Sequence, residues 1–314
     1  MCIVWLIMDR SDPLESLLSN ISLDEDIKNF LINIGKEVNN AILKYINMFD
    51  LNSRLKSAVT HLLGKGKNVR SIFSYLLSLS LGIEREKALK LASAIEYSHL
   101  ASLIHDDIID NASQRRGRES VHKRYGVETA IVAGDALILI SNYLTNDLGK
   151  EALKESLIAG LKMCSGEILE LLVGENADLD TYMKIIYLKT ASFFEHIARV
   201  NAVLANLEEE LVNKYGELGK TVGIAFQIRD DILDIIGDEK VLGKPVNQDL
   251  NKPNIVRVIQ KEEELSLEEA IKKAQEILDE WVKKSIKILN NLNLKSEYMK
   301  LLNNILISMK YRLI

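Results

Sequence analysis

Residues 99–118 read HLASLIHDDIIDNASQRRGR, and this stretch places three aspartates in an otherwise aliphatic run. They are Asp106, Asp107 and Asp110, and three arginines follow within two helical turns. Burying carboxylates on an apolar helix is costly unless a cation meets them. Residues 229–234, RDDILD, repeat the pattern with Asp230, Asp231 and Asp234. We therefore predict that the two clusters face each other across a helical bundle and hold divalent metal between them.

The composition predicts an all-α fold. Leu, Ile, Lys, Glu, Ala and Asn dominate the 314 residues, and these residues together favour helices over sheets. No proline interrupts residues 14–244, because the three prolines are Pro13, Pro245 and Pro253. No internal repeat or linker divides the chain. We expect a single large helical bundle, one domain over residues 1–314, with a short apolar N-terminal extension at residues 1–12.

The charge and the cysteines argue against several classes of protein. A net charge of −5 argues against nucleic acid as the main partner. Cys2 and Cys164 lie far apart, so we expect neither a disulfide framework nor a zinc site, which fits a reducing cytoplasm. The start, MCIVWLIM, lacks a basic leader, so we predict packing on a neighbouring helix or subunit in place of a signal peptide. We find no apolar run of about 18 residues and predict no membrane span.

A basic, glycine-rich loop precedes the first cluster. Residues 64–68, GKGKN, lead into an apolar helix that runs to Leu81. Lys67 and Arg70 are three residues apart and would lie near one another at the start of this helix. Alone, the loop would be interpreted as a turn with solvated charges. The aspartate-rich helix that follows makes it a candidate diphosphate site.

Residues 84–111 are predicted to form one long helix. One stripe of it, at i, i+7 and i+11, carries His99, Asp106 and Asp110. Small residues leave this helix unobstructed before the first aspartate, at Ser98, Ala101 and Ser102. We interpret His105 as a core residue. Residues 111–118 should be a loop, and two of its side chains can fork onto phosphate oxygens, namely Arg115 and Arg116.

Further helices are expected at about 150–174, 178–206 and 208–237. In the second of these Lys189-Thr190 interrupts an apolar face, and in the third Gln227 lies one turn before Asp230. Residues 238–252 form the one long polar break in the second half, and loops of this length are often functional. We predict that this loop closes as a lid over a charged mouth through Lys244 and Lys252.

Aspartates at i and i+3 or i+4 direct their oxygens to a common point. Oxygen ligands without Cys or His favour magnesium or manganese over zinc. Two clusters and many cations imply two polyanionic groups, and the cations are Lys67, Arg70, His99, Arg115, Arg116, Lys189, Lys244 and Lys252. The chain has no calcium-binding loop and no Walker or Rossmann glycine pattern.

These segments resemble the trans-isoprenyl diphosphate synthases, or polyprenyl synthetases, over residues 60–255. That family carries a GGKRxRP-like loop, a first aspartate motif with paired arginines, a Lys-Thr pair, an FQxxDDxxD motif and a GKPxGxD segment. The similar segments here are residues 66–71, 106–116, 189–190, 226–234 and 243–249. The resemblance implies an isoprenoid-synthase-type bundle around a central cavity. It also implies a Mg²⁺-dependent prenyltransferase, cytoplasmic and homodimeric, that uses isopentenyl diphosphate and an allylic diphosphate.

The resemblance also implies roles for single residues. Isopentenyl diphosphate would be held by Lys67, Arg70, His99 and Arg116. The allylic diphosphate would be held by Arg115, Lys189, Thr190, Gln227 and Lys244, with Lys252 a further candidate. Magnesium would be bound by Asp106, Asp110 and Asp230, supported by Asp107, Asp231 and Asp234. The chain departs from the family pattern at Asn68, Ser71 (usually Pro), Asn247 and Gln248, and it is two residues shorter between Leu250 and Asn254.

In the implied reaction the allylic carbon–oxygen bond ionises, because metal and cationic side chains stabilise the departing diphosphate. The double bond of isopentenyl diphosphate attacks the carbocation, and the released pyrophosphate removes the proton. Bulky aromatics just before the first aspartate give short products in the family, whereas this chain has Ser98, Ala101 and Ser102. It is most like heptaprenyl-type or geranylgeranyl diphosphate synthases. We expect a product of C20 or longer. The end of the cavity that holds the growing chain could instead be set by a partner helix or by Leu137, Ile138 or Leu139.

Three alternatives stay open. A non-catalytic or regulatory prenyl-diphosphate-binding subunit would tend to lose one aspartate cluster and would co-purify with an active synthase. A terpene cyclase needs one diphosphate site, and a cyclic product would reveal it. A purely structural bundle would not explain two aspartate clusters amid Ile and Leu.

Overall fold

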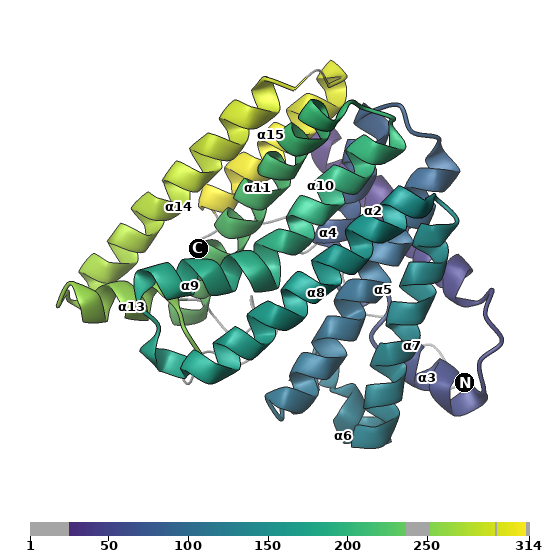
Figure 1. The fold of residues 1–314 in the computed structure, drawn as a ribbon, viewed down its shortest axis with the longest axis horizontal. Helices are drawn as coiled ribbons and strands as arrows, with labels where there is room; N and C mark the ends of the chain where they lie inside the picture. The colour runs from purple at the N-terminus through teal and green to yellow at the C-terminus, as the bar shows by residue number, and fades with distance from the viewer. Residues whose placement is uncertain (1–24, 237–251, 293, 312–314) are drawn as a thin grey trace, which may run out of the picture.

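The computed structural model describes residues 25–236, 252–292 and 294–311, and they form an all-α bundle (Figure 1). The first half contains α2 (Glu25–Ile46), α3 (Ser53–Thr60), α4 (Val69–Ser80), α5 (Arg85–Ile109), α6 (Val121–Tyr125), α7 (Val127–Asn146) and α8 (Lys150–Val173). The second half contains η1 (Gly174–Asn176), α9 (Leu179–Ile186), η2 (Tyr187–Ala191), α10 (Ser192–Leu204), α11 (Glu209–Ile236), α13 (Ile255–Glu262), α14 (Leu267–Asn290) and α15 (Ser296–Tyr311). The predicted fold class is confirmed.

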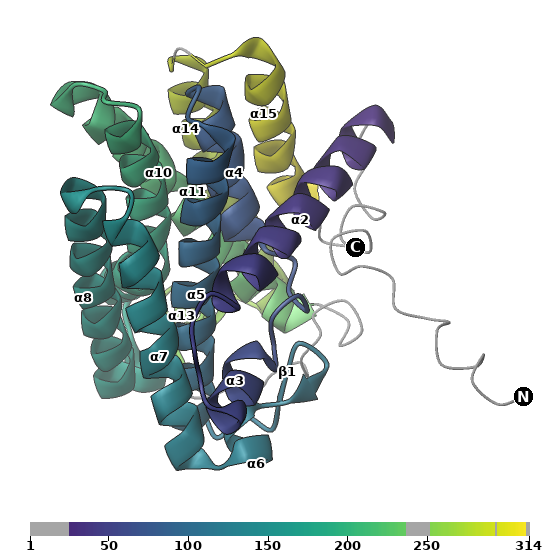
Figure 2. The same ribbon diagram turned by 90° about the vertical axis from the view of Figure 1, so that its right-hand side faces the viewer.

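Two helices, α5 and α11, are packed on several sides. α5 lies against α2, α4 and α7, while α11 lies against α10 and α14 (Figures 1 and 2). A helix surrounded in this way must be apolar nearly all round, and any polar side chain on it needs a partner. Both aspartate motifs lie at the C-terminal ends of these two helices. The single domain over residues 1–314 stays a prediction, because the apolar tip at residues 1–12 lies outside the described residues.

Close packing between α10 and α11 depends on a glycine. A Cβ added at Gly219 of α11 would stand 2.1 Å from the Phe194 carbonyl oxygen of α10. Since real side chains never approach so closely, glycine lets the two helix backbones touch. This contact brings η2 and its Lys189 beside α11.

The helix predicted at residues 178–206 is confirmed over residues 179–204, but it contains a π-helical turn that was not predicted. α9 begins after Asp178, whose side chain accepts a hydrogen bond from the Thr181 N–H at 2.8 Å. A π-helical turn, η2, then separates α9 from α10 and carries Lys189 and Thr190. Such turns insert an extra residue and are frequent at functional sites. The predicted loop at 111–118 contains a short antiparallel hairpin of β1 (Gln114–Arg115) and β2 (Arg118–Glu119).

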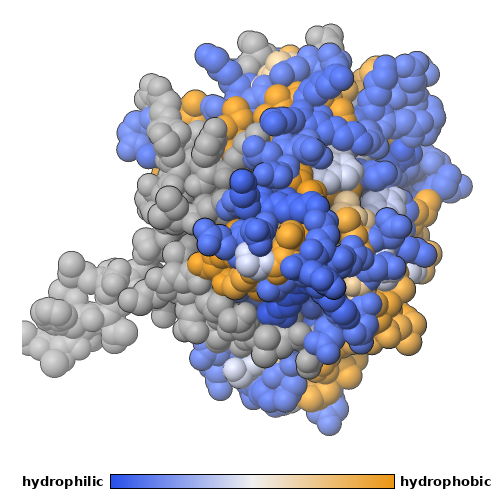
Figure 3. All heavy atoms as spheres, turned by 90° about the vertical axis from the view of Figure 1, so that its left-hand side faces the viewer, coloured by the Kyte–Doolittle hydropathy of each residue, from blue (hydrophilic) through white to orange (hydrophobic). Residues whose placement is uncertain are grey.

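The helix α7 is long and apolar enough to cross a membrane, although no span was predicted. One of its faces packs on α3, α5 and α6, as a core helix does. Large apolar side chains are exposed on α7 and on the adjacent α8: Val127, Ile131, Val132, Ile138, Leu139, Tyr143, Leu157, Ile158, Leu161, Ile168, Leu171 and Leu172. The face of the molecule in Figure 3 is mostly hydrophilic, with apolar side chains in separate patches.

Candidate active site

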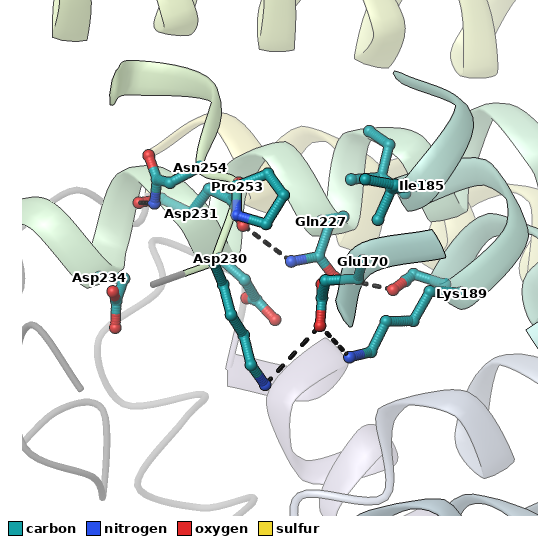
Figure 4. A pocket seen from close by; sticks show the side chains of 12 residues that line it. Glu170, Ile185, Lys189, Gln227, Asp230, Asp231, Asp234, Pro253 and Asn254 are labelled. Atoms are coloured by element: carbon teal, nitrogen blue, oxygen red, sulfur yellow. Dashed lines mark hydrogen bonds and ion pairs between the residues drawn. The ribbon is translucent and has the colours of Figure 1, made fainter. Parts of the chain in front are cut away.

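One pocket gathers residues from α8, α9, η2, α11 and the chain before α13 (Figure 4). Its volume is about 170 Å³. The lining residues are Glu170, Ile185, Ile186, Lys189, Thr190, Gln227, Asp230, Asp231, Asp234, Lys252, Pro253 and Asn254. All three aspartates of the second motif therefore lie at this pocket, together with four of the side chains predicted to hold the allylic diphosphate.

Lys252 connects the first motif to the same pocket. Its Nζ lies 2.5 Å from Asp110 Oδ2 and 3.7 Å from Glu170 Oε2. Asp110 ends α5, and Asp106 lies one turn before it. Burial raises the pKa of Asp106 to about 7, while the charges of Lys189 and Lys252 oppose that shift. The predicted convergence of the two motifs is thus supported by contacts at one pocket.

Two glutamates of α8, absent from the predicted site, hold Lys189. Glu170 Oε2 lies 2.6 Å from Lys189 Nζ (Figure 4), and Glu167 Oε2 lies at the same distance from it. Burial lowers the pKa of Lys189, but Glu170, Asp106 and Glu167 outweigh burial and raise it above its ordinary value. The two glutamates are three residues apart on a partly apolar helix, so the spacing that identified the aspartates could have identified them as well.

Asp107, the second aspartate of the first motif, is fully buried. Both Nε and Nη2 of Arg115 donate to its Oδ1, at 2.8 and 2.6 Å. This pairing gives Asp107 a structural role and does not favour it as the metal ligand that was predicted. It also commits the guanidinium of Arg115, which was predicted to hold the allylic diphosphate, to a protein carboxylate.

Asp231, the second aspartate of the second motif, is also buried, and its side chain accepts three hydrogen bonds. The Tyr182 hydroxyl and the Ile255 N–H donate to Oδ2 at 2.9 and 3.1 Å, and Gln227 Nε2 donates to Oδ1 at 2.8 Å. Gln227 Oε1 in turn accepts from the Thr190 hydroxyl at 2.8 Å. Burial raises the pKa of Asp231 to about 7, and these donors oppose the shift. Asp231 therefore organises the pocket wall.

The residues predicted to hold isopentenyl diphosphate form a neighbouring cluster. Arg70 Nη1 lies 3.4 Å from His99 Nε2, and the Arg70 guanidinium lies 5.1 and 5.0 Å from the ring centroids of Phe194 and Phe226. These two rings hold the cation by cation–π attraction. Burial, together with nearby arginines, lowers the pKa of His99 well below its ordinary value, so the imidazole is neutral at pH 7.

Arg116 joins this cluster through a buried carboxylate that was not predicted. Its Nη2 donates to Glu96 Oε1 at 2.9 Å, and Glu96 Oε2 accepts from the Ser71 hydroxyl at 3.2 Å. Glu96 is 1% exposed, and a buried carboxylate is costly without partners. The bonds from Arg116 and Ser71 offset that cost. A Cβ added at Gly66 would stand 2.4 Å from Arg116 Cζ, which places the loop that carries Lys67 directly over Arg116.

The small residues predicted to influence product length differ in exposure. Ser98 and Ser102 are partly exposed on the stripe of α5 that leads to Asp106, whereas Ala101 is fully buried. The Ser98 hydroxyl donates to Ser141 Oγ of α7 at 2.8 Å. The stripe is therefore open at the two serines.

Some predicted residues are placed elsewhere or cannot be placed. Leu137 is buried, while Ile138 and Leu139 belong to the exposed apolar face of α7. Lys244 and the predicted GKPxGxD segment lie outside the described residues.

The donor set fits a hard divalent cation. Asp106, Asp110 and Asp230 offer only carboxylate oxygens, and the Lys252 ammonium already stands beside Asp110 as a cation. Among residues 25–236, 252–292 and 294–311, no three His, Cys, Asp or Glu side chains are gathered as a ready-made metal site. Mg²⁺ usually takes one or two carboxylates and completes its shell with water and substrate phosphates, so this arrangement fits it.

Comparison with known proteins identifies the family of this chain. The family model named polyprenyl synthetase matches residues 52–291. The geranylfarnesyl diphosphate synthase of Aeropyrum pernix is 39% identical over 213 residues, which cover 63% of this chain and 67% of that protein. A short chain isoprenyl diphosphate synthase of Methanocaldococcus jannaschii is 34% identical over 279 residues, covering 85% and 80%.

Solved structures agree with these sequence matches. The geranylgeranyl pyrophosphate synthetase from Pyrococcus horikoshii superposes with a TM-score of 0.82 at 29% identity, over 92% of this chain and all of that one. The heptaprenyl diphosphate synthase from Staphylococcus aureus gives a TM-score of 0.80 at 25% identity, over 93% of this chain and 99% of that one.

Proposed function

This chain belongs to the polyprenyl synthetase family, and from that premise we propose that it condenses isopentenyl diphosphate with an allylic diphosphate, as a Mg²⁺-dependent prenyltransferase that makes a longer all-trans polyprenyl diphosphate. The observation that carries the proposal is the meeting of Asp110 with Lys252 at the pocket that Asp230 lines. No observation favours the alternative, a non-catalytic subunit, because both aspartate clusters are present.

The allylic diphosphate would bind in the described pocket. Asp106, Asp110 and Asp230 would hold Mg²⁺, which when bound supplies the positive charge that stabilises a departing diphosphate. The ammonium groups of Lys189 and Lys252 add charge at the same place. They also orient the diphosphate so that its carbon–oxygen bond breaks with the electron pair leaving on pyrophosphate.

Isopentenyl diphosphate would bind at the neighbouring basic cluster. Arg70, Arg116 and Lys67 supply positive charge, and neutral His99 can donate one ring N–H to a phosphate oxygen. The double bond of this substrate attacks the allylic carbocation and forms the new carbon–carbon bond. Loss of a proton to the released pyrophosphate then restores a double bond, so no protein general base is required.

We propose a product of C20 or longer, supported by the partly exposed Ser98 and Ser102 below Asp106. A Ser102→Phe variant should block this stripe and shorten the product without abolishing turnover. Ala101→Phe differs, since Ala101 is fully buried and a larger side chain there overpacks the core. Chain-length separation of the products checks both, and an unchanged distribution for Ser102→Phe would mean that the chain grows elsewhere.

We also propose a homodimer in the cytoplasm, with the exposed apolar face of α7 and α8 covered by a second copy. That face carries twelve large apolar side chains. Large exposed apolar surfaces often mark interaction sites. Light scattering should give the mass of two chains, and a Leu139→Asp, Leu161→Asp double variant should give one. A monomeric wild-type protein would contradict this.

The proposed function is tested by incubating the purified chain with labelled isopentenyl diphosphate and allylic primers from C5 to C20. We expect labelled prenyl diphosphates that form with Mg²⁺ and not with EDTA. Absence of condensation with every primer would overturn the proposal. A cyclic hydrocarbon would indicate a cyclase in its place.

A further inference from the structure

Tyr182 lies outside every motif that predicted the site, yet its hydroxyl reaches the pocket wall. It lies on α9 and is fully buried. Its hydroxyl donates to Asp231 Oδ2 at 2.9 Å. Burial raises the pKa of Tyr182 well above its ordinary value, so the phenol keeps its proton for this bond.

Asp231 extends this contact to the chain that begins α13. Its Oδ2 also accepts from the Ile255 N–H at 3.1 Å, and its carbonyl accepts from Asn254 Nδ2 at 2.9 Å. Asn254 caps α13, since its Oδ1 accepts from the Val256 N–H at 3.0 Å. Tyr182 of α9 and Asp231 of α11 therefore fix the first residues of α13.

The position of Asn254 controls where Lys252 can reach. The one residue between them is Pro253, whose ring fixes its own φ and favours an extended backbone at Lys252. Because this link is rigid, a displacement of the Asn254 backbone also displaces Lys252. At the observed position the Lys252 ammonium lies 2.5 Å from Asp110 and 3.7 Å from Glu170.

We propose that Tyr182 is a positioning residue for Lys252, acting through Asp231 and the start of α13. This inference rests on the proposed function, in which Lys252 contacts the allylic diphosphate while Arg70 and His99 hold the other substrate. Loss of the Tyr182 hydroxyl should therefore weaken the binding of one substrate and spare the other. Asp231 would keep two of its three side-chain donors, so the bundle remains folded.

Steady-state kinetics of Tyr182→Phe test the selectivity of this effect. We expect KM for the allylic diphosphate to rise about 3- to 10-fold, as for the loss of one hydrogen bond, with KM for isopentenyl diphosphate nearly unchanged. Tyr215→Phe is the matched control, because Tyr215 is a buried tyrosine on α11 that does not line the pocket. It lies sixteen residues before Asp231, about 24 Å along the helix. Equal rises in both KM values would overturn the proposal.

A double-mutant cycle tests the path through Lys252. The probe is inorganic pyrophosphate with Mg²⁺, titrated calorimetrically into wild type, Tyr182→Phe, Lys252→Ala and the double variant. We expect Tyr182→Phe to weaken binding in the wild-type background and to have no further effect once Lys252 is removed. An undiminished effect in the Lys252→Ala background would overturn the proposal. The titration needs no turnover, so it separates this inference from a failure of the proposed condensation.

Discussion

The two aspartate motifs have the same spacing but use their second aspartate differently. Asp107 pairs with one cation, Arg115, which lies eight residues away on the adjoining hairpin. Asp231 instead accepts from Gln227 on its own helix and from two residues that are distant in sequence, Tyr182 and Ile255. The first contact is local and charged, whereas the second joins three separate elements.

This difference indicates a division of labour inside each motif. The outer aspartates, Asp106 and Asp110 in one and Asp230 in the other, are the carboxylates at or near the pocket mouth. The second aspartates hold the structure that carries them. Substitution of the outer aspartates should therefore lower activity, whereas substitution of the second aspartates should lower stability.

The largest effect is expected from the outer aspartates. Asp106→Asn and Asp230→Asn each remove a charged metal ligand, so kcat should fall by about 100- to 1000-fold. The melting temperature should change little, because neither carboxylate supports a distant element. Initial rates and thermal melts on the same preparations check both points. A large drop in the melting temperature of either variant would contradict the proposed division of labour.

The second aspartates should differ from each other in stability. Asp231→Asn places an amide donor against existing donors in a buried site, which should cost about 2–3 kcal/mol of unfolding free energy. Asp107→Asn should cost about 1 kcal/mol, because both Arg115 bonds go to one oxygen that asparagine keeps. Urea denaturation measures both, and a larger loss for Asp107→Asn would reverse the comparison.

The pH dependence of stability should report Asp106. Its pKa rises from 3.8 in the unfolded chain to about 7 in the folded protein, so the folded state binds this proton more tightly between those values. The free energy of unfolding should therefore fall as pH rises from about 4 to 7, with about 1–2 kcal/mol from Asp106 after allowance for solvent screening. Asp106→Asn is the control, and denaturation at several pH values should show a flatter profile for it. Parallel profiles would contradict the assignment.

The smallest effect is expected at the basic cluster beside the first motif. Ser71→Ala removes one hydrogen bond from Glu96, which positions Arg116. KM for isopentenyl diphosphate should rise about 2- to 5-fold, with KM for the allylic substrate unchanged. Ser93→Ala is the control, because Ser93 is equally buried but bonds to the Leu89 carbonyl of its own helix. An equal rise in KM for isopentenyl diphosphate in both variants would show that Ser71 has no specific role.

Much of the fold and the central part of the site could be predicted from the sequence. Carboxylates spaced along apolar helices need partners, and this requirement predicted that the two motifs meet. Lys252, which lines the pocket of Asp230, contacts Asp110 of the other motif. Glu96, Glu167 and Glu170 carry the same signal of an acid on a largely apolar helix, and it could have been applied to them.

Other features depend on contacts that spacing does not encode. Which aspartate is committed to the fold depends on Tyr182 and Ile255, which are 49 and 24 residues from Asp231. The π-helical turn at Lys189 packs against both α8 and α11, and the spacing of the local sequence does not encode these contacts.

The most direct test of the division of labour is a calorimetric titration of Mg²⁺–pyrophosphate into wild type and four variants: Asp106→Asn, Asp107→Asn, Asp230→Asn and Asp231→Asn. Binding should be lost in the two outer variants. It should be retained in the two second-position variants when measured well below their melting temperatures. Loss of binding in a fully folded Asp107→Asn or Asp231→Asn protein, with binding retained in Asp106→Asn, would contradict the account.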